Sequence, residues 1–248
     1  MTAARSMAGT LGAVSAALLL VAGCSSSGVS EADASQPAGA PPSAGQRLFA
    51  DTFDDDSNQW TLPENENARS AVEGGDLVWE AKQPADLRPH VLAAPIGEAS
   101  DRGELRMRDV VVRASFTTVR GSGAMGVFCR EVRDTDSDFQ WFEFVARDGF
   151  AAIRRADAGG HLDVLAHTTK VDLPLGQRAT MEAVCADTDD GTTRLWLSLD
   201  GAVVLAATST EQLGNGAAGL QGYDSPDRAS RARFLVRWHD FAVYRPTS

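Results

Sequence analysis

The chain has 248 residues and a formal net charge of −11 at neutral pH, with 34 acidic and 23 basic side chains. A surface this negative disfavours nucleic acid and anionic lipid headgroups as partners. Only three cysteines are present, so at most one intramolecular disulfide can form.

A secretory signal is predicted over residues 1–23. One basic residue, Arg5, precedes an apolar run that is rich in alanine and ends in three leucines. This run, 8–23, is shorter and less uniformly apolar than the roughly 18 to 20 residues that a stable transmembrane helix needs. We therefore expect a cleaved signal and no permanent transmembrane helix.

The tetrad Val21-Ala22-Gly23-Cys24 resembles the cleavage site of bacterial lipoproteins. In that family small residues admit the signal peptidase, and the cysteine thiol receives diacylglycerol before it becomes the new N-terminus. The resemblance implies that Cys24 carries lipid, with palmitate as a typical acyl chain. It also implies a location on the extracytoplasmic face of the cell membrane, held there through the lipid only. An ordinary signal cut elsewhere, with Cys24 discarded, is the alternative.

Residues 24–45 have the composition of a flexible tether. After Cys24 the segment consists mostly of Ser, Ala, Gly and Pro, with a single aliphatic side chain larger than alanine. Such a segment buries too little apolar area to offset the entropy of ordering it. As a flexible coil it would reach about 25 Å from the lipid. One folded domain is expected to follow, over residues 46–248.

The domain has the sequence pattern of β-strands throughout. The run 109–119 is β-branched and aromatic, and the run 194–199 alternates leucine with other side chains, as half-buried strands do. Asp-Gly pairs at 148–149 and 200–201 lie between such runs and predict two hairpins. No segment keeps a helical apolar period for about twelve residues, so helix is expected only as isolated turns.

About a dozen strands must hide their apolar faces by packing as two sheets or by closing a barrel. Five stretches resemble, in order, the elements of concanavalin A-like jelly-roll domains. That superfamily includes laminin G-like modules, lectins, laminarinase-type glycosidases and keto-glycoside hydrolase-like domains. The resemblance implies an all-β fold, a two-sheet antiparallel jelly-roll sandwich. The stretches are 48–60, 123–130, 142–155, 182–201 and 238–245.

Cys129 and Cys185 lie in apolar runs that we expect to form neighbouring or facing strands. With Cys24 acylated, they are an even pair in an exported chain, where disulfides persist. We predict a disulfide between them. Two buried free thiols are the alternative, and a cysteine nucleophile is disfavoured because no histidine is placed by the sequence to activate either thiol.

No catalytic motif is recognised. Laminarinase-type relatives carry Glu-x-Asp-x-x-Glu or Glu-x-Asp-x-Glu on one strand, which puts the carboxylates on one face. That pattern is absent, and Glu143 is the only carboxylate in the middle of its strand. There is no Gly-x-Ser-x-Gly, and the four histidines lack zinc-site spacing. These absences favour a non-catalytic module over a glycoside hydrolase or lyase with an unrecognised active site.

Loops with several aspartates are the candidate sites for structural calcium, the one cofactor that we consider. Carboxylate oxygens are the ligands that calcium prefers. The alternative is a set of solvated turns, because aspartate caps turns well. The candidate ligands are the aspartates of 51–56 and Asp187, Asp189 and Asp190.

Two strands, 138–146 and 194–199, each present a tryptophan and a charged side chain on the face opposite their expected core residues. Sugar rings stack on exposed indoles, while carboxylates and guanidinium groups bind hydroxyls. This pattern predicts binding of a cell-envelope glycan or glycoconjugate. The alternatives are a second small core under covering loops, or a module that binds an envelope protein. The candidate ligand-binding residues are Trp141, Glu143, Arg194 and Trp196.

Overall fold

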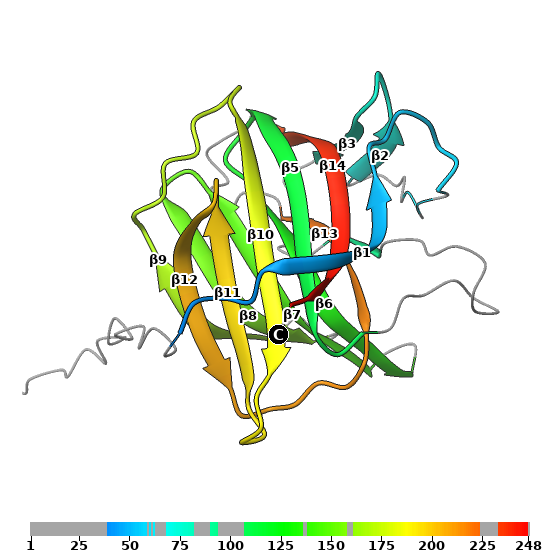
Figure 1. Cartoon of the computed structure of the whole chain (residues 1–248). Helices are drawn as coiled ribbons and strands as arrows, with labels where there is room; N and C mark the ends of the chain where they lie inside the picture. The colour runs from blue at the N-terminus through cyan, green and yellow to red at the C-terminus, as the bar shows by residue number, and fades with distance from the viewer. Residues whose placement is uncertain are drawn as a thin grey trace, which may run out of the picture. The chain divides into compact units, whose positions relative to one another are not determined.

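The computed structural model consists of strands, turns and bends over the residues it describes, with no helix among them (Figure 1). The all-β prediction is therefore confirmed. No helix among the described residues could cross a membrane. The predicted signal, Cys24 and the tether up to residue 38 lie outside the described residues. The described residues are 39–58, 60, 62, 68–81, 90–93, 107–135, 138–157, 161–223 and 233–247.

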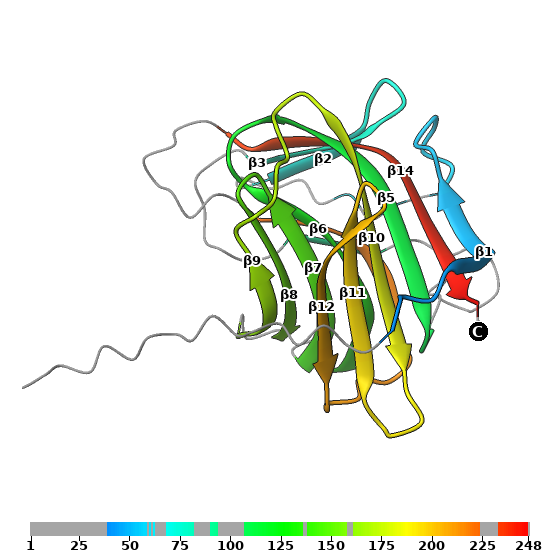
Figure 2. The same cartoon turned by 60° about the vertical axis from the view of Figure 1, so that its left-hand side comes forward.

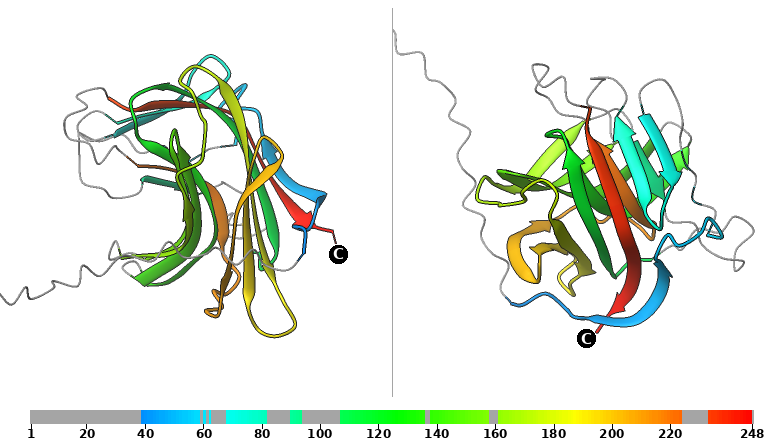
Figure 3. Two further views of the ribbon diagram at one scale, coloured as in Figure 1. Left: turned by 90° about the vertical axis from the view of Figure 1, so that its left-hand side faces the viewer. Right: turned by 90° about the horizontal axis from the view of Figure 1, so that it is seen from above.

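The strands form two antiparallel sheets packed face to face (Figures 2 and 3). Sheet A has the order β12 (Ala202–Ser209), β11 (Thr193–Leu199), β10 (Arg178–Asp187), β5 (Val110–Arg120), β14 (Leu235–Pro246), β3 (Leu77–Ala81) and β2 (Ala68–Val72), and β1 (Ala44–Asp51) also pairs with β14. Sheet B has the order β4 (His90–Ala93), β13 (Ala217–Tyr223), β6 (Ala124–Thr135), β7 (Asp138–Arg147), β8 (Phe150–Asp157) and β9 (Leu162–Thr168).

Both predicted hairpins are present. Arg147 pairs with Phe150 across Asp148-Gly149, and Leu199 pairs with Ala202 across Asp200-Gly201. Asp200 and Gly201 have φ angles of 49° and 81°. A two-residue turn with positive φ at both positions matches the twist of the strands it joins, and aspartate and glycine tolerate that conformation.

The core lies between the two sheets and is built from alternate residues of each strand. Phe142 and Phe144 of β7 face it from sheet B, and the leucines of β11 face it from sheet A. Side chains on the intervening positions therefore point to the outer face of their sheet. This alternation positions every candidate site discussed below.

A disulfide joins the two sheets through the core. Cys129 of β6 and Cys185 of β10 are bonded, and neither side chain is exposed. The predicted pairing is confirmed. It connects strands of different sheets, as the expectation of facing strands required.

The N-terminal part of the described chain crosses the outer face of sheet A, as Figures 1 and 3 show. Ala44 packs against the outward-facing side of β10 and β11, and β1 then pairs with the C-terminal half of β14, from Ala44 opposite Pro246 to Asp51 opposite Phe241. We call residues 39–51 the β1 strap. Its strand begins two residues before the expected start of the domain at Gln46.

Candidate functional site

The four predicted ligand-binding residues lie on two different faces of the molecule. Trp141 and Glu143 project from β7 on the outer face of sheet B, and Trp196 projects from β11 on the outer face of sheet A with its neighbour Arg194. The whole core separates the two faces. The two pairs therefore cannot line one groove.

Trp196 belongs to a small apolar cluster under the β1 strap. Its side chain is 4% exposed and packs with Val111, Val184 and Ala206, while Ala44 of the strap packs against the same cluster. The indole offers no open ring face in this arrangement. This is the second small core that the sequence left as an alternative.

On the outer face of sheet B, four side chains converge on the carboxyl group of Glu143. Glu143 has no exposed surface. Trp141 Nε1 donates a hydrogen bond to its Oε2 at 3.2 Å, the Tyr223 hydroxyl donates to the same oxygen, and Arg154 forms an ion pair with Oε1. The Arg154 guanidinium also lies over the Tyr223 ring, 4.8 Å from its centroid. We call Trp141, Glu143, Arg154, Gln221 and Tyr223 the Glu143 cluster.

Strand register brings this cluster together. Glu143 and Arg154 are direct partners in the β7–β8 hairpin. Gln221 and Tyr223 lie two strands away on β13, with Gly126 of β6 opposite Gln221. Because glycine has no side chain, β6 and β7 approach each other closely at that point. A Cβ on Gly126 would come within 2.2 Å of the Phe144 carbonyl oxygen and 2.9 Å of Val145 Cγ1.

Burial controls the protonation of the cluster. Loss of hydration raises the pKa of Glu143, although the charge of Arg154, the hydrogen bonds from Tyr223 and Trp141, and the nearby amide of Gln221 oppose the effect. Burial and the neighbouring Glu143 charge raise the pKa of Tyr223 well above its ordinary value. The phenol therefore stays protonated and acts as a donor at neutral pH.

Gln221 is the side chain of this cluster with unused hydrogen-bonding capacity. It is 1% exposed, and neither its amide oxygen nor its amide nitrogen meets hydrogen-bond geometry with a partner in the described part of the chain. Its amide nevertheless lies close enough to Glu143 to lower the pKa of that carboxyl group. A buried amide with a free donor and a free acceptor is unfavourable, and such groups commonly mark a functional position.

A polar pocket of about 280 Å³ opens where β7 begins and β8 ends, away from the Asp148-Gly149 turn. Arg155 forms ion pairs there with Glu211 and Asp163. Ala156, which lines the pocket, also packs with Trp141. The pocket therefore lies beside the Glu143 cluster. Its lining residues are Gln140, Arg155, Ala156, Asp157, His161 and Glu211.

The acidic loops are occupied by internal partners. Asp51 accepts hydrogen bonds from Trp60 Nε1 at 2.6 Å and from the Phe53 amide at 2.7 Å, and Asp190 accepts bonds from Thr188 and Thr192 in its own turn. Within the described ranges no three His, Cys, Asp or Glu side chains are grouped to hold a metal ion. A calcium site stays a prediction.

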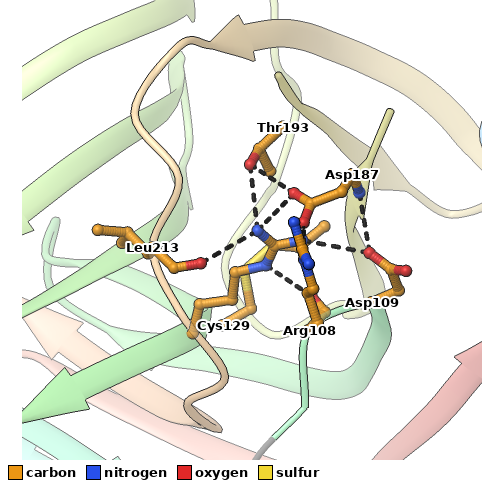
Figure 4. Close-up of a disulfide and its surroundings, with 8 residues drawn as sticks. Arg108, Asp109, Cys129, Asp187, Thr193 and Leu213 are labelled. Atoms are coloured by element: carbon orange, nitrogen blue, oxygen red, sulfur yellow. Dashed lines mark hydrogen bonds and ion pairs between the residues drawn. A yellow bond between two sulfur atoms is a disulfide. The ribbon is translucent and has the colours of Figure 1, made fainter. Parts of the chain in front are cut away.

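Asp187 belongs instead to a buried arginine network beside the disulfide (Figure 4). The fully buried Arg130 guanidinium contacts Asp187 Oδ1 at 2.7 Å, Asp109 Oδ1 at 3.2 Å and Thr193 Oγ1 at 3.1 Å. Burial opposes ionisation of Asp187, but hydrogen bonds from Arg130, Thr193 and Arg108 outweigh it and lower the pKa of the carboxyl group. These contacts tie β6 of sheet B to the ends of β10 and β11 of sheet A, which is a structural role.

Sequence reasoning found two members of the Glu143 cluster and missed three. The position of Arg154 could have been predicted, because a two-residue turn at Asp148-Gly149 pairs residue 143 with residue 154 directly. Gln221 and Tyr223 carried no such signal, since their position depends on β13 pairing with β6, which is distant in sequence.

No family model and no curated protein matches the chain. Solved structures do match. A Bacillus subtilis protein of unknown function with a galectin-like fold superposes with a TM-score of 0.57 at 15% identity, covering 82% of this chain and 98% of that one. The fold is a concanavalin A-like jelly-roll sandwich.

Two further structures share this fold. The carbohydrate recognition domain of Emp47p has a TM-score of 0.50 at 11% identity, over 77% of this chain and 90% of that chain. A Bacillus licheniformis β-glucanase has a TM-score of 0.51 at 10% identity, over 83% and 100%. At these identities the likeness establishes the fold, which both binding domains and enzymes use.

Proposed function

We propose that this chain is a lipid-anchored module of the cell envelope that binds a glycan or glycoconjugate through the Glu143 cluster. A carbohydrate recognition domain shares its fold, as does a β-glucanase. The cluster combines a phenol, a guanidinium, an amide and a carboxyl group on one sheet face, which are group types that recognise sugar hydroxyls. The indole of Trp141 is 1% exposed and stacks on Phe139, so it supports the carboxyl group through its Nε1 hydrogen bond and offers no open ring face.

The observation that carries the proposal is the Gln221 amide, whose oxygen and nitrogen make no hydrogen bond of good geometry with the described residues. An amide presents a donor and an acceptor side by side, and so do two adjacent hydroxyls of a sugar. A bound hydroxyl pair would satisfy both buried groups and remove the penalty of leaving them unpaired. The polar pocket beside the cluster, with Arg155, Asp157 and His161 in its lining, offers further partners for hydroxyls.

The cluster contains one carboxyl group, whereas most glycoside hydrolases use two. Binding rather than hydrolysis is therefore the main proposal. The raised pKa of Glu143 is the observation that favours the second candidate, a glycosidase or lyase, because a general acid must hold its proton near neutral pH. The cluster is buried, so part of the binding free energy is spent on exposing its side chains to the ligand. We therefore expect dissociation constants from about micromolar to millimolar.

The test is calorimetry or ligand-observed NMR of the full mature chain against a panel of cell-wall oligosaccharides. Gln221→Leu removes both amide groups and keeps the bulk, so it should weaken binding by roughly 10- to 100-fold. It should not lower the melting temperature, because it also removes an unsatisfied buried group. Trp141→Ala should abolish binding.

Trp196→Phe, on the outer face of the other sheet, is the matched control and should bind like the wild type. Wild-type binding that survives Gln221→Leu unchanged would contradict this site. Absence of binding by the wild type would favour an envelope protein as the partner, and turnover of a glycoside would favour the enzyme.

A further inference from the structure

The outer face of sheet A carries a second polar cluster, which glycan binding does not use. In β14, Trp238 and Phe241 both face the core, and the ladder with β5 shifts its register between Trp238 and Asp240. Two residues therefore fit between consecutive core positions, so His239 and Asp240 both project outward. A bulge of this kind re-aims side chains, and bulges are over-represented beside active sites.

The bulge places His239 between a hydroxyl and a carboxylate. Its Nε2 lies 2.8 Å from Thr117 Oγ1 on β5, and its Nδ1 lies 2.6 Å from Asp76 Oδ1 at the start of β3. An ionised carboxylate only accepts hydrogen bonds, so Nδ1 carries the ring proton and Nε2 accepts the proton of the Thr117 hydroxyl. Hydroxyl, imidazole and carboxylate in this order form the nucleophile, base and orienting group of hydrolytic triads.

Two arginines flank the hydroxyl on the neighbouring strands. Arg178 of β10 and Arg237 of β14 are both register partners of Thr117. Arg237 Nη1 also contacts Asp76 Oδ2 at 3.1 Å, which holds the carboxylate in place. Arg178 Nη2 forms an ion pair with Asp240 Oδ2 at 2.7 Å and donates a hydrogen bond to Ser115 Oγ at 2.6 Å. The Arg178 side chain is 59% exposed, so a small molecule can reach this face from solution. Cationic donors beside the nucleophile are suited to stabilise negative charge on a carbonyl oxygen.

We propose that Thr117, His239 and Asp76 form an acyl-transfer site for small esters. Thr117 Oγ1 forms a bond to the acyl carbon and its proton moves to His239 Nε2. The ester C–O bond then breaks, and the departing alcohol takes that proton. Water repeats the sequence on the acyl-threonine, releasing the carboxylic acid and restoring Thr117.

The experiment uses the full mature chain and 4-nitrophenyl acetate. Release of nitrophenol and an acetylated Thr117 peptide in the mass spectrum are the expected results. Thr117→Val keeps the side-chain shape, and His239→Gln keeps a hydrogen-bonding group. Each should lower turnover by about 100-fold or more, the usual contribution of general acid–base catalysis.

Thr118→Val is the matched control, because Thr118 is the next residue of β5 and points to the opposite face. It should keep wild-type turnover. Circular dichroism confirms that each variant is folded. Turnover that is equal in Thr117→Val and wild type would overturn the proposal, as would a folded wild type that gives neither turnover nor an acetylated Thr117.

Discussion

At the scale of single residues, the outer face of sheet B is governed by one carboxyl group that water does not reach. Glu143 is held by Arg154, Tyr223 and Trp141, yet burial still raises its pKa. A buried ion pair is weak support for stability, because desolvation offsets much of the attraction. The Gln221 amide beside this ion pair makes no hydrogen bond of good geometry with the described residues. The combination agrees better with the proposed role in ligand binding than with a role in stabilising the fold.

Glu143→Gln should therefore change the pH dependence of stability. The folded-state pKa lies above the unfolded value, so the stabilising contribution of the protonated carboxyl is complete below about pH 4.5 and is lost as the pH rises through the folded-state pKa. Glutamine stays neutral throughout, so wild type should lose stability relative to the variant as the pH rises. Urea denaturation of both proteins from about pH 4 to pH 8 measures the difference. A difference that stays constant over this range would contradict it.

At the scale of elements, strand faces were predictable and strand partners were not. Alternation gave the core side of β7 and β11, and Asp-Gly gave both hairpins, because these depend on neighbours in the chain. Trp141 and Trp196 were thus correctly turned outward. Which sheet each strand joins depends on long-range pairing, and the cover over Trp196 depends on the path of β1. Residue alternation within a strand indicates neither of these, so Trp141 and Trp196 were expected on one face although they lie on the outer faces of different sheets.

The link between β6 and β10 gives a prediction at this scale. The disulfide spans 56 residues, and in the chain-entropy model a loop of that length contributes about 4 kcal/mol to the free energy of unfolding. The double variant Cys129→Ser/Cys185→Ser should lose about that much in urea denaturation. It should still fold, because the Arg130 network holds the same strands.

Reducing the wild type gives an independent check, since it breaks the bond without changing a residue. Reduced wild type and the double variant should unfold at similar urea concentrations. A double variant as stable as the oxidised wild type would show that native strain cancels the entropic gain.

At the scale of the whole molecule, the acidic domain and the proposed lipid at Cys24 fit together. An anionic domain gains nothing from lying on anionic headgroups, so in the proposed lipoprotein the acyl chains would supply the attachment. Diacylation provides the two membrane signals that stable anchoring requires. The tether composition and the tetrad 21–24 are local sequence patterns, and what they indicate stays a prediction.

Cys24→Ala tests the anchor. Without the thiol no diacylglycerol can be attached, so the variant should leave the detergent phase for the aqueous phase in a phase-partition assay, or retain its uncleaved signal. Cys129→Ser is a suitable control, because it removes a cysteine without touching the lipidation motif and should remain in the detergent phase. Unchanged partitioning of Cys24→Ala would contradict the lipoprotein assignment.

The β1 strap also determines how the domain responds to force. A pull through the chain that precedes residue 39 reaches the strap before any strand of the core. The Thr247 amide donates a hydrogen bond to the Ser43 carbonyl oxygen, outside the last ladder pair of Ala44 and Pro246, so that bond breaks first and the β1–β14 bonds follow one at a time. Peeling in this order needs far less force than shearing a whole strand. The strap would detach at low force while β5, β10 and β14 stay paired. The side chain of Trp196 would then be exposed without unfolding of the core.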